Sequence, residues 1–220
     1  ELSDSQKGFV RAGYSQFRSY YNGTGGYYPT GSVWYPLSDD DLHVDRGEFF
    51  FEAGLRLENK PQVTFRYAHQ WRDGGKSTTA WGDAPTTDGN RKISAGLWDI
   101  DELRDIFEVD ARHTVKNTDF GVGLRYDKAN NDNARLMTNT GAAAPRVTDR
   151  QQTDSDVFSV HAFSETRFNE KNVATVGYSF TTLDTDLGGF RGSGAEFDEP
   201  TTFTYSSLTG GSRVHQHVGN

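Results

Sequence analysis

The stretch that decides the fold covers residues 48–72 and reads EFFFEAGLRLENKPQVTFRYAHQWR. Apolar residues alternate with polar or small ones on both sides of Asn59-Lys60-Pro61. On one face the alternation places Phe49, Phe51, Ala53, Leu55 and Leu57, then Val63, Phe65, Tyr67, His69 and Trp71. A period of two residues is typical of a β-strand with one apolar face and one polar face. The stretch predicts an antiparallel hairpin in which residues 48–58 pair with residues 62–72 and Leu55 lies opposite Phe65.

The same hairpin pattern occurs twice more along the chain. Residues 104–128 alternate around a turn at 116–119, which would bring Asp110 opposite Arg125, and residues 156–183 alternate around a turn at 169–171. The three hairpins repeat at roughly 55 residues. Gly8–Tyr20 is expected to form a first strand, with Val10, Ala12 and Tyr14 on its more apolar face. Residues 213–220 are expected to begin an eighth strand.

Between the hairpins lie polar stretches at residues 22–45, 73–103, 129–155 and 184–212, which are rich in Gly, Asp, Asn, Thr and Ser. We interpret them as long loops that alternate with the short turns. Short turns at one rim and long loops at the other are typical of outer-membrane barrels. The sequence therefore predicts an all-β fold: an antiparallel up-and-down transmembrane β-barrel of the bacterial outer membrane, a single domain over residues 1–220, with short periplasmic turns and long extracellular loops.

The expected strand number bears on the size of that barrel. About eight strands are visible, and a barrel of about eight strands has an interior filled by side chains, whereas about 16 strands enclose an aqueous channel. The chain ends on Asn220, within an expected strand and without a terminal aromatic residue. We therefore expect the chain to be a truncated piece of a larger barrel.

Composition excludes several classes of function. Only 34% of the residues are hydrophobic and no run approaches the roughly 20 apolar residues of a membrane helix. There is no Cys, so the chain has no thiolate metal site and no haem attached through Cys, and we expect no cofactor. A net charge of −8 argues against nucleic acid as a partner. Nucleophile elbow, Walker and Rossmann motifs are absent, which predicts that the chain is not an enzyme.

The polar face of the predicted hairpins carries the candidate functional residues, which we expect to line the pore. They are Glu48, Glu52, Arg56, Arg66, Arg72, Glu108, Asp110, Arg112, Arg125, Glu165 and Arg167. These charges would line a wet pore, fill a closed lumen as ion pairs, or form a merely solvated face.

The apolar face is predicted to contact lipid. The residues assigned to it are Phe51, Leu55, Phe65, Val109, Leu124, Val160 and Val176. Aromatic rings should mark where strands leave the membrane, with Tyr20, Tyr21, Phe49, Trp71, Phe107, Tyr126, Phe158 and Phe180 at the long-loop rim and Phe120 and Phe168 at the short-turn rim. The alternative is that any β-protein carries aromatic residues on its strands.

Two weaker signals concern cations. Asp39, Asp40 and Asp41 with Asp45, and the run 130–133, offer oxygen ligands for a divalent cation, but neither has EF-hand spacing and solvated loops are the preferred interpretation. His215 and His217 share a strand face at a spacing that can seat a metal or lie near a partner's haem. Polar lumen lining is the commoner role of such a pair, and we predict no metal site.

Several segments resemble a known family. They are residues 97–102 (LWDIDE), 104–108 (RDIFE), 117–126 (NTDFGVGLRY) and 177–184 (GYSFTTLD), which resemble hairpins of the decahaem-cytochrome-associated porin family. The resemblance implies a barrel that sheathes a multihaem c-type cytochrome and threads it through the outer membrane for extracellular electron transfer. Such a sheath needs more strands than are visible here.

The leading functional hypothesis is a non-enzymatic porin-like channel with a charged lumen, whose environment is outer-membrane lipid. Because the lumen charges are mixed, the chain should not discriminate strongly among small ions, and without haem it should not conduct electrons alone. Three alternatives stay open: the cytochrome sheath, a small closed barrel for adhesion or surface recognition, and a soluble all-β secreted domain. A requirement for detergent separates the last from the others.

Overall fold

The computed structural model describes residues 1–4, 7–27, 34–86, 89–138, 146–197 and 199–220. Within these ranges every regular element is a β-strand, and no helix is long and apolar enough to span a membrane. The strands are β1 (Leu2–Asp4), β2 (Gly8–Tyr20), β3 (Gly26–Tyr27), β4 (Tyr35–Pro36), β5 (His43–Leu55), β6 (Gln62–Thr86), β7 (Gly89–Val115), β8 (Thr118–Thr138), β9 (Arg146–Asn169), β10 (Asn172–Gly194) and β11 (Thr202–Gly219).

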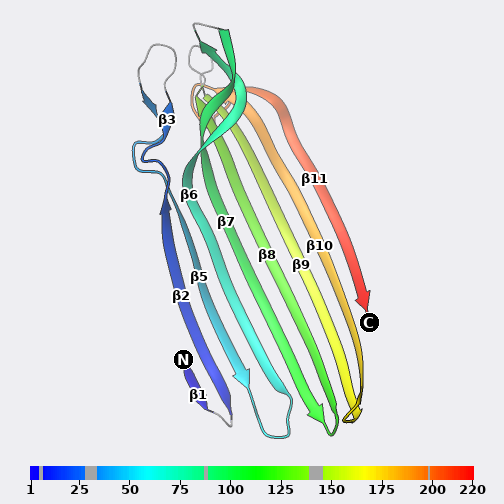
Figure 1. Ribbon diagram of the computed structural model, residues 1–220. Coiled ribbons are helices and arrows are strands. Elements are labelled where there is room, and N and C mark those ends of the chain that lie inside the picture. The colour runs from blue at the N-terminus through cyan, green and yellow to red at the C-terminus, as the bar shows by residue number, and fades with distance from the viewer. Residues whose placement is uncertain (5–6, 28–33, 87–88, 139–145, 198) are drawn as a thin grey trace.

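Nine of these strands form one antiparallel sheet in the order β1-β2-β5-β6-β7-β8-β9-β10-β11, and β3 and β4 pair separately. Every strand of the sheet thus lies beside its neighbours in the chain, which confirms the predicted all-β up-and-down arrangement. The turns that join β5 to β6, β7 to β8 and β9 to β10 lie together at the lower end of Figure 1, which we call the turn end. The opposite end, where β3 lies, is called the far end.

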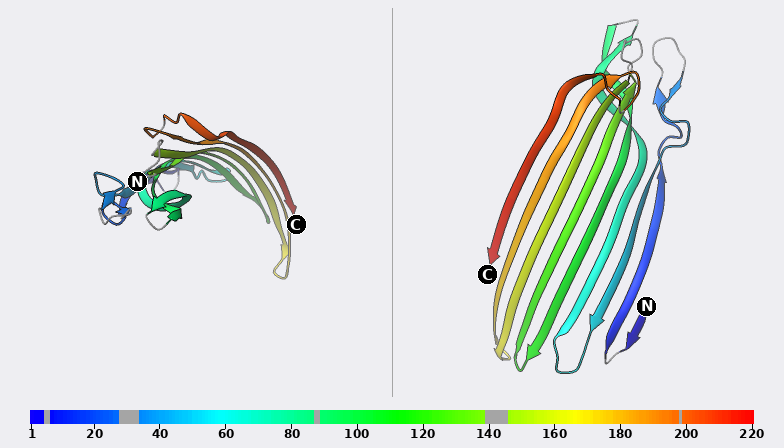
Figure 2. Two further views of the ribbon diagram at one scale, coloured as in Figure 1. Left: turned by 90° about the horizontal axis from the view of Figure 1, so that it is seen from above. Right: turned by 180° about the vertical axis from the view of Figure 1, so that it is seen from behind.

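The sheet is curved but open. Seen from above, it forms an arc whose two edges do not meet (Figure 2). The edge strands β1 and β11 each pair with a single neighbour in the described part of the chain. A closed barrel is therefore not present among these residues.

The register of the first hairpin differs from the sequence prediction. Leu55 lies opposite Val63, and Phe65 lies opposite Ala53, so the predicted pairing of Leu55 with Phe65 is wrong by two residues. The reason is a longer turn over residues 56–61, in which Asn59 has a φ of 54° and the Lys60 amide donates to the Leu57 carbonyl at 3.2 Å. A shift of two residues keeps every side chain on its predicted face.

The second hairpin is shifted for the opposite reason. Its turn contains only Lys116 and Asn117, with Lys116 at a φ of 56°, so Arg125 lies opposite Glu108 and the predicted pairing of Asp110 with Arg125 is wrong. The third hairpin turns as predicted between Asn169 and Asn172. There the Asn169 side-chain oxygen accepts hydrogen bonds of 2.9 Å from the backbone amides of residues 171 and 172.

Most of the expected long loops are strands. Residues 73–103, 129–155 and 184–212 largely continue β6 to β11, and residues 213–220 belong to the end of β11 and not to the start of a strand. In these segments polar residues occur on both faces and apolar ones such as Ile100 and Met137 are interspersed among them, so they lack the regular alternation that would identify them. Polar cross-strand contacts replace apolar ones there, such as Arg150 donating to Asp132 at 2.8 Å. Among the described residues, irregular backbone lies between β2 and β5, where β3 and β4 also form, and between β10 and β11.

The two faces of the sheet differ sharply over its turn-end half. We call the apolar face the one that carries the predicted lipid-facing set, because the register places all of these residues on one side: Phe51, Leu55, Phe65, Val109, Leu124, Val160 and Val176. Val10, Ala12 and Tyr14 join them, as predicted for β2. We call the other side the charged face.

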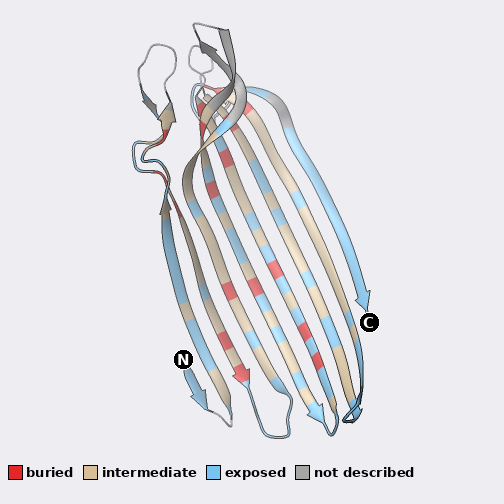
Figure 3. Cartoon of the chain, in the orientation of Figure 1, coloured by how far each residue is buried: buried red, intermediate tan, exposed pale blue. Residues whose placement is uncertain are grey.

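Burial identifies the charged face as the concave one. In the turn-end half, Glu52 (8% exposed), Ala68 (1%) and Asp127 (4%) point to the charged face, whereas Leu55 on the apolar face is 59% exposed. Side chains crowd together on the inner side of a curved sheet and spread apart on the outer side. Buried residues are scattered along the middle strands and form no separate core (Figure 3), as expected for a single layer.

Rings that lie over glycines allow the strands to pack closely on the concave side. Phe163 lies opposite Gly121, where an added Cβ would come 2.1 Å from the ring, and His161 lies opposite Gly123, where the distance would be 2.0 Å. Gly13 and Gly54 are covered in the same way by Phe50 and Phe9. Glycine leaves room for a neighbouring ring to lie flat across the backbone.

Substitution of Gly121 tests this packing. Gly121→Ala should displace the Phe163 ring and lower the free energy of unfolding by about 1–3 kcal/mol, the usual cost of overpacking. Gly188→Ala is the matched control, because the nearest atom to its added Cβ is 4.0 Å away. Denaturant unfolding in detergent would measure both variants, and an equal loss in the two would contradict the role of the ring.

Candidate functional site: the charged concave face

A continuous network of ion pairs crosses the charged face from β5 to β8. Its contacts are Glu48–Arg66 (3.5 Å), Arg66–Glu108 (4.0 Å), Glu108–Arg125 (2.5 Å), Arg125–Asp127 (3.0 Å) and Asp127–Arg104 (2.6 Å). Acids and bases alternate along it, so almost every charge has a partner on a neighbouring strand. In such a row, each charged side chain finds its partner on the same sheet, so no second protein layer is needed to pair it.

Further pairs border the network on the same face. Arg11 of β2 meets Glu52 of β5 at 2.7 Å, and Arg72 of β6 meets Glu102 of β7 at 3.0 Å. Gln70 donates to Glu48 at 2.6 Å, which ties the network to the neighbouring row. The charged face is therefore polar but largely neutralised between β2 and β8.

The other half of the concave side is different in character. Along the middle of β9 and β10, hydroxyl pairs take the place of charges: Ser155 contacts Thr185 at 3.1 Å and Ser159 contacts Thr181 at 3.0 Å. Leu183 lies opposite Val157 and Val214, which gives a short apolar row. Charge is thus concentrated on the half of the sheet nearer the N-terminus.

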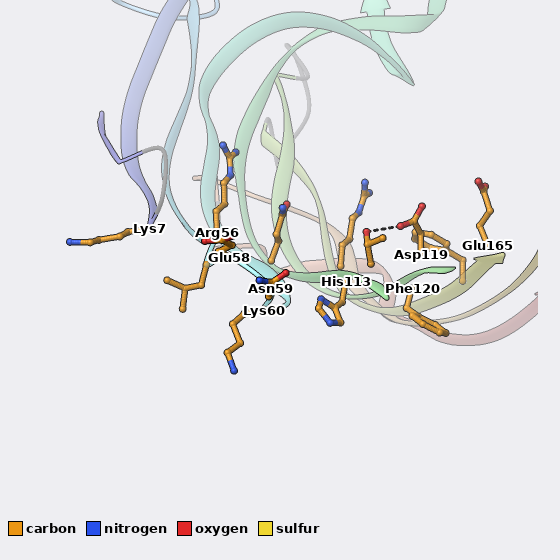
Figure 4. A pocket seen from close by; sticks show the side chains of 14 residues that line it. Lys7, Arg56, Glu58, Asn59, Lys60, His113, Asp119, Phe120 and Glu165 are labelled. Carbon is orange, nitrogen blue, oxygen red and sulfur yellow. Dashed lines mark hydrogen bonds between the residues drawn. The ribbon is translucent and has the colours of Figure 1, made fainter. Parts of the chain in front are cut away.

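A cavity of about 970 Å³ opens at the turn end (Figure 4). Arg56, Asp119 and Glu165 point to one side of the strands there, while Lys60 and His113 point to the other. The hydroxyl of Thr114 donates to Asp119 at 2.6 Å. Basic and acidic groups are interspersed at this mouth, so it carries no ring of a single sign.

A second cavity, of about 570 Å³, lies on the charged face between β2 and β9. We call it the arginine groove, because Arg46, Arg72 and Arg104 contribute to its lining. Glu48, Glu102 and Asp127 also line it. The arginine groove therefore contains part of the ion-pair network, the bordering Arg72–Glu102 pair, and Arg46, which belongs to neither.

The predicted site residues are brought together on one face. Nine of them project from strands of the charged face: Glu48, Glu52, Arg66, Arg72, Glu108, Asp110, Arg112, Arg125 and Glu165. Arg56 lies in the turn after β5, and Arg167 lies near the end of β9, 4.0 Å from Glu165. They form a spread surface and not a compact site.

Sequence reasoning missed several charged residues of this face. Arg11, Arg104 and Asp127 lie in strands that were predicted, and counting every second residue from the chosen set would have found them. Arg46 lies just outside the expected loop 22–45, and counting back two residues from Glu48 would have found it as well. Glu102 lies in the stretch 73–103, which was interpreted as a loop, and no regular alternation there marks it.

Two aspartates towards the far end carry displaced pKa values. The pKa of Asp132 is lowered because Arg150 donates two hydrogen bonds of 2.8 Å and Gln152 a third of 3.0 Å. The pKa of Asp45 is lowered by its hydrogen bonds with Arg18. These ion pairs join neighbouring strands beyond the apolar band.

The candidate cation ligands are placed differently from the expectation. His215 and His217 do not line the concave side, because His217 lies opposite Phe180 on the apolar face and accepts from or donates to the Tyr178 hydroxyl at 2.7 Å. Residues 130–133 form part of β8, where Asn130 donates to Asp154. In the described ranges no three His, Cys, Asp or Glu side chains gather where they could hold a metal ion.

The ion-pair network can be tested through Glu108, which lies between two arginines. Glu108→Gln should leave Arg66 and Arg125 with one carboxylate contact each and lower the free energy of unfolding by about 1 kcal/mol. Glu165→Gln should change it by less than about 0.5 kcal/mol, because Glu165 is only loosely paired. The measurement is denaturant unfolding of both variants, and the network would be unsupported if Glu165→Gln were the more damaging.

Comparison of the chain with protein-family models, with curated proteins and with solved structures finds no match.

Proposed function

We propose that this sheet is part of the wall of a transmembrane β-barrel in a bacterial outer membrane, and that the protein acts as a porin-like channel and not as an enzyme. The apolar face contacts lipid and the charged face lines an aqueous lumen. The observation that carries the proposal is a single-layered sheet with a broad exposed apolar band on one side and ion pairs on the other. Barrel closure is part of the proposal, with further strands joining the open edges.

The large exposed surface of the chain supports the proposal that lipid covers its apolar face. A compact soluble protein of this mass exposes about 10,000 Å², whereas this chain exposes 14189 Å². Large apolar side chains form part of this surface: Leu55 is 59% exposed, Val176 65% and Leu124 44%. Soluble monomers rarely leave contiguous apolar patches of this extent in water, and the hydrocarbon of a bilayer would cover such a band.

A row of aromatic residues supports a boundary between lipid and water. Phe51, Tyr67, Phe107, Tyr126 and Phe158 lie side by side on five consecutive strands of the apolar face. Tyr67 and Phe107 are in ring contact with centroids 4.9 Å apart. The hydroxyls of the two tyrosines donate to Asp105 and Asp156, in the next row towards the far end. Rings with one polar end suit the headgroup level of a bilayer.

The length of the apolar run fits a bilayer. On β7, the outer face carries Phe107, Val109, Ala111 and Val115 over a run of nine residues that His113 interrupts, and Asp105 borders the run. A tilted strand crosses the hydrocarbon in roughly 9–11 residues. Towards the far end, Asp73, Asp101 and Asp132 stand in one row of the same face, which would lie outside the bilayer.

Arginine substitutions on the two faces test the orientation. Phe65→Arg, or Leu55→Arg, should cost about 2–4 kcal/mol near the bilayer midplane. Thr64→Arg is the matched control, since it introduces the same side chain one residue away on the charged face, opposite Asp110; it should cost less, as should Arg66→Leu. Unfolding in phospholipid vesicles measures these values. Equal penalties at residues 64 and 65 would refute the assigned orientation.

Permeability of liposomes that contain the full-length protein tests the channel function. We expect free passage of small uncharged and charged solutes. A tight vesicle that reduces an enclosed acceptor only when a multihaem c-type cytochrome is supplied would favour the electron-conduit role implied by the family resemblance. Vesicles that do neither would refute both functions and leave the surface-recognition barrel.

A further inference from the structure

Arg46 of β5 is the starting point, because it is a cation without an acidic partner beside a network in which the other charges are paired. It lies on the charged face, opposite Phe17 on one side and Arg72 on the other. Its guanidinium stands 6.0 Å from the Phe17 ring centroid, and no ion pair joins it to a carboxylate in the described ranges. Its Nε is buried and has no hydrogen-bond partner.

The neighbouring acids cannot serve Arg46 without leaving another arginine. Glu102 pairs with Arg72, Asp127 with Arg104 and Arg125, and Glu48 with Arg66 and Gln70. Counting the arginine groove together with the network, Arg46, Arg66, Arg72, Arg104 and Arg125 face only Glu48, Glu102, Glu108 and Asp127. One positive charge is left over in a protein whose net charge is −8.

We propose that the arginine groove is a binding site for a small oxyanion, held between Arg46 and Arg72. Two guanidiniums directly across from each other repel unless an anion lies between them, and the Nε of Arg72 is buried without a partner in the same way as that of Arg46. A guanidinium edge offers two parallel N–H donors, which match two oxygens of a phosphate or carboxylate group. A cavity of about 570 Å³ accommodates such a group with its hydration water.

Arg112 shows that an unpaired arginine alone is not the basis of this inference. It also projects from the charged face, stands 6.0 Å from the Phe163 ring and has no ion-pair partner in the described ranges. Its neighbours across the strands are Gln62 and Gly121, and its side chain is exposed at the turn end. Arg112 thus has neither a second guanidinium opposite it nor a buried Nε. Its substitution therefore controls for the loss of one positive charge and of one contact between an arginine and a ring.

This site rests on the proposed function, because an anion would reach the groove through the lumen of the channel. Anion binding, however, can be measured without measuring conduction. The experiment titrates the detergent-solubilised full-length protein with inorganic phosphate by calorimetry, at constant ionic strength set with chloride. We expect saturable binding. Arg46→Gln should weaken it about tenfold or more, as expected for the loss of a charge-assisted hydrogen bond, whereas Arg112→Gln should leave it unchanged.

Two further variants sharpen the outcome. Arg46→Lys keeps the charge but not the parallel donors, so it should bind phosphate more weakly than the unsubstituted protein and more tightly than Arg46→Gln. Far-ultraviolet circular dichroism checks that each variant keeps its sheet. Undetectable phosphate binding, or an equal loss in Arg46→Gln and Arg112→Gln, would overturn the site. Vesicle permeability would still report on the channel function in either case.

Discussion

The antiparallel hydrogen-bonded ladder, with its two-residue period, is the constraint on which the rest of this structure depends. Each strand is tied to its neighbours in the chain, so consecutive side chains must point to opposite sides of one layer. Over the turn-end half, no second layer covers either side in the described residues. Phe65 and Arg66 are adjacent in the chain, yet one joins an exposed apolar band and the other an ion-pair network. The two sides of the sheet therefore differ in chemical character.

Curvature links this alternation to electrostatics. Side chains on the concave side converge, which brings Arg66 within 4.0 Å of carboxylates on both flanking strands and Arg125 within reach of Glu108 and Asp127. The same convergence would create clashes between bulky side chains, and glycines such as Gly121 and Gly123 relieve it by lying beneath rings. The positions of the glycines and the pairing of the charges thus both follow from the convergence of side chains on the concave side.

The sequence predicted which side most residues occupy better than it predicted their neighbours. The side of the sheet to which a side chain points depends only on whether its position along the strand is odd or even. The two-residue shifts in the first two hairpins therefore left Leu55 and Arg125 on their predicted sides. Neighbours depend on turn length, and the Asn59 and Lys116 conformations that set it are not evident from alternation. The extended strands around Asp101 and Asn131 were missed because polar and apolar residues are mixed on both of their faces. His217 was assigned to the wrong side because polarity was taken to indicate the concave face, whereas β11 presents Val214 there instead.

The consecutive order of the strands has a consequence for how the sheet is made. Because β8 pairs with β7 and β9, and β9 with β8 and β10, each new strand docks on an edge that the preceding strand has just provided. Loop closure costs little across a turn as short as Lys116-Asn117, and each strand of the sheet pairs with the strand before it in that sheet. The sheet can thus form by adding one strand after another at one edge. The unpaired amides and carbonyls of the last strand added then form the hydrogen bonds to the next strand.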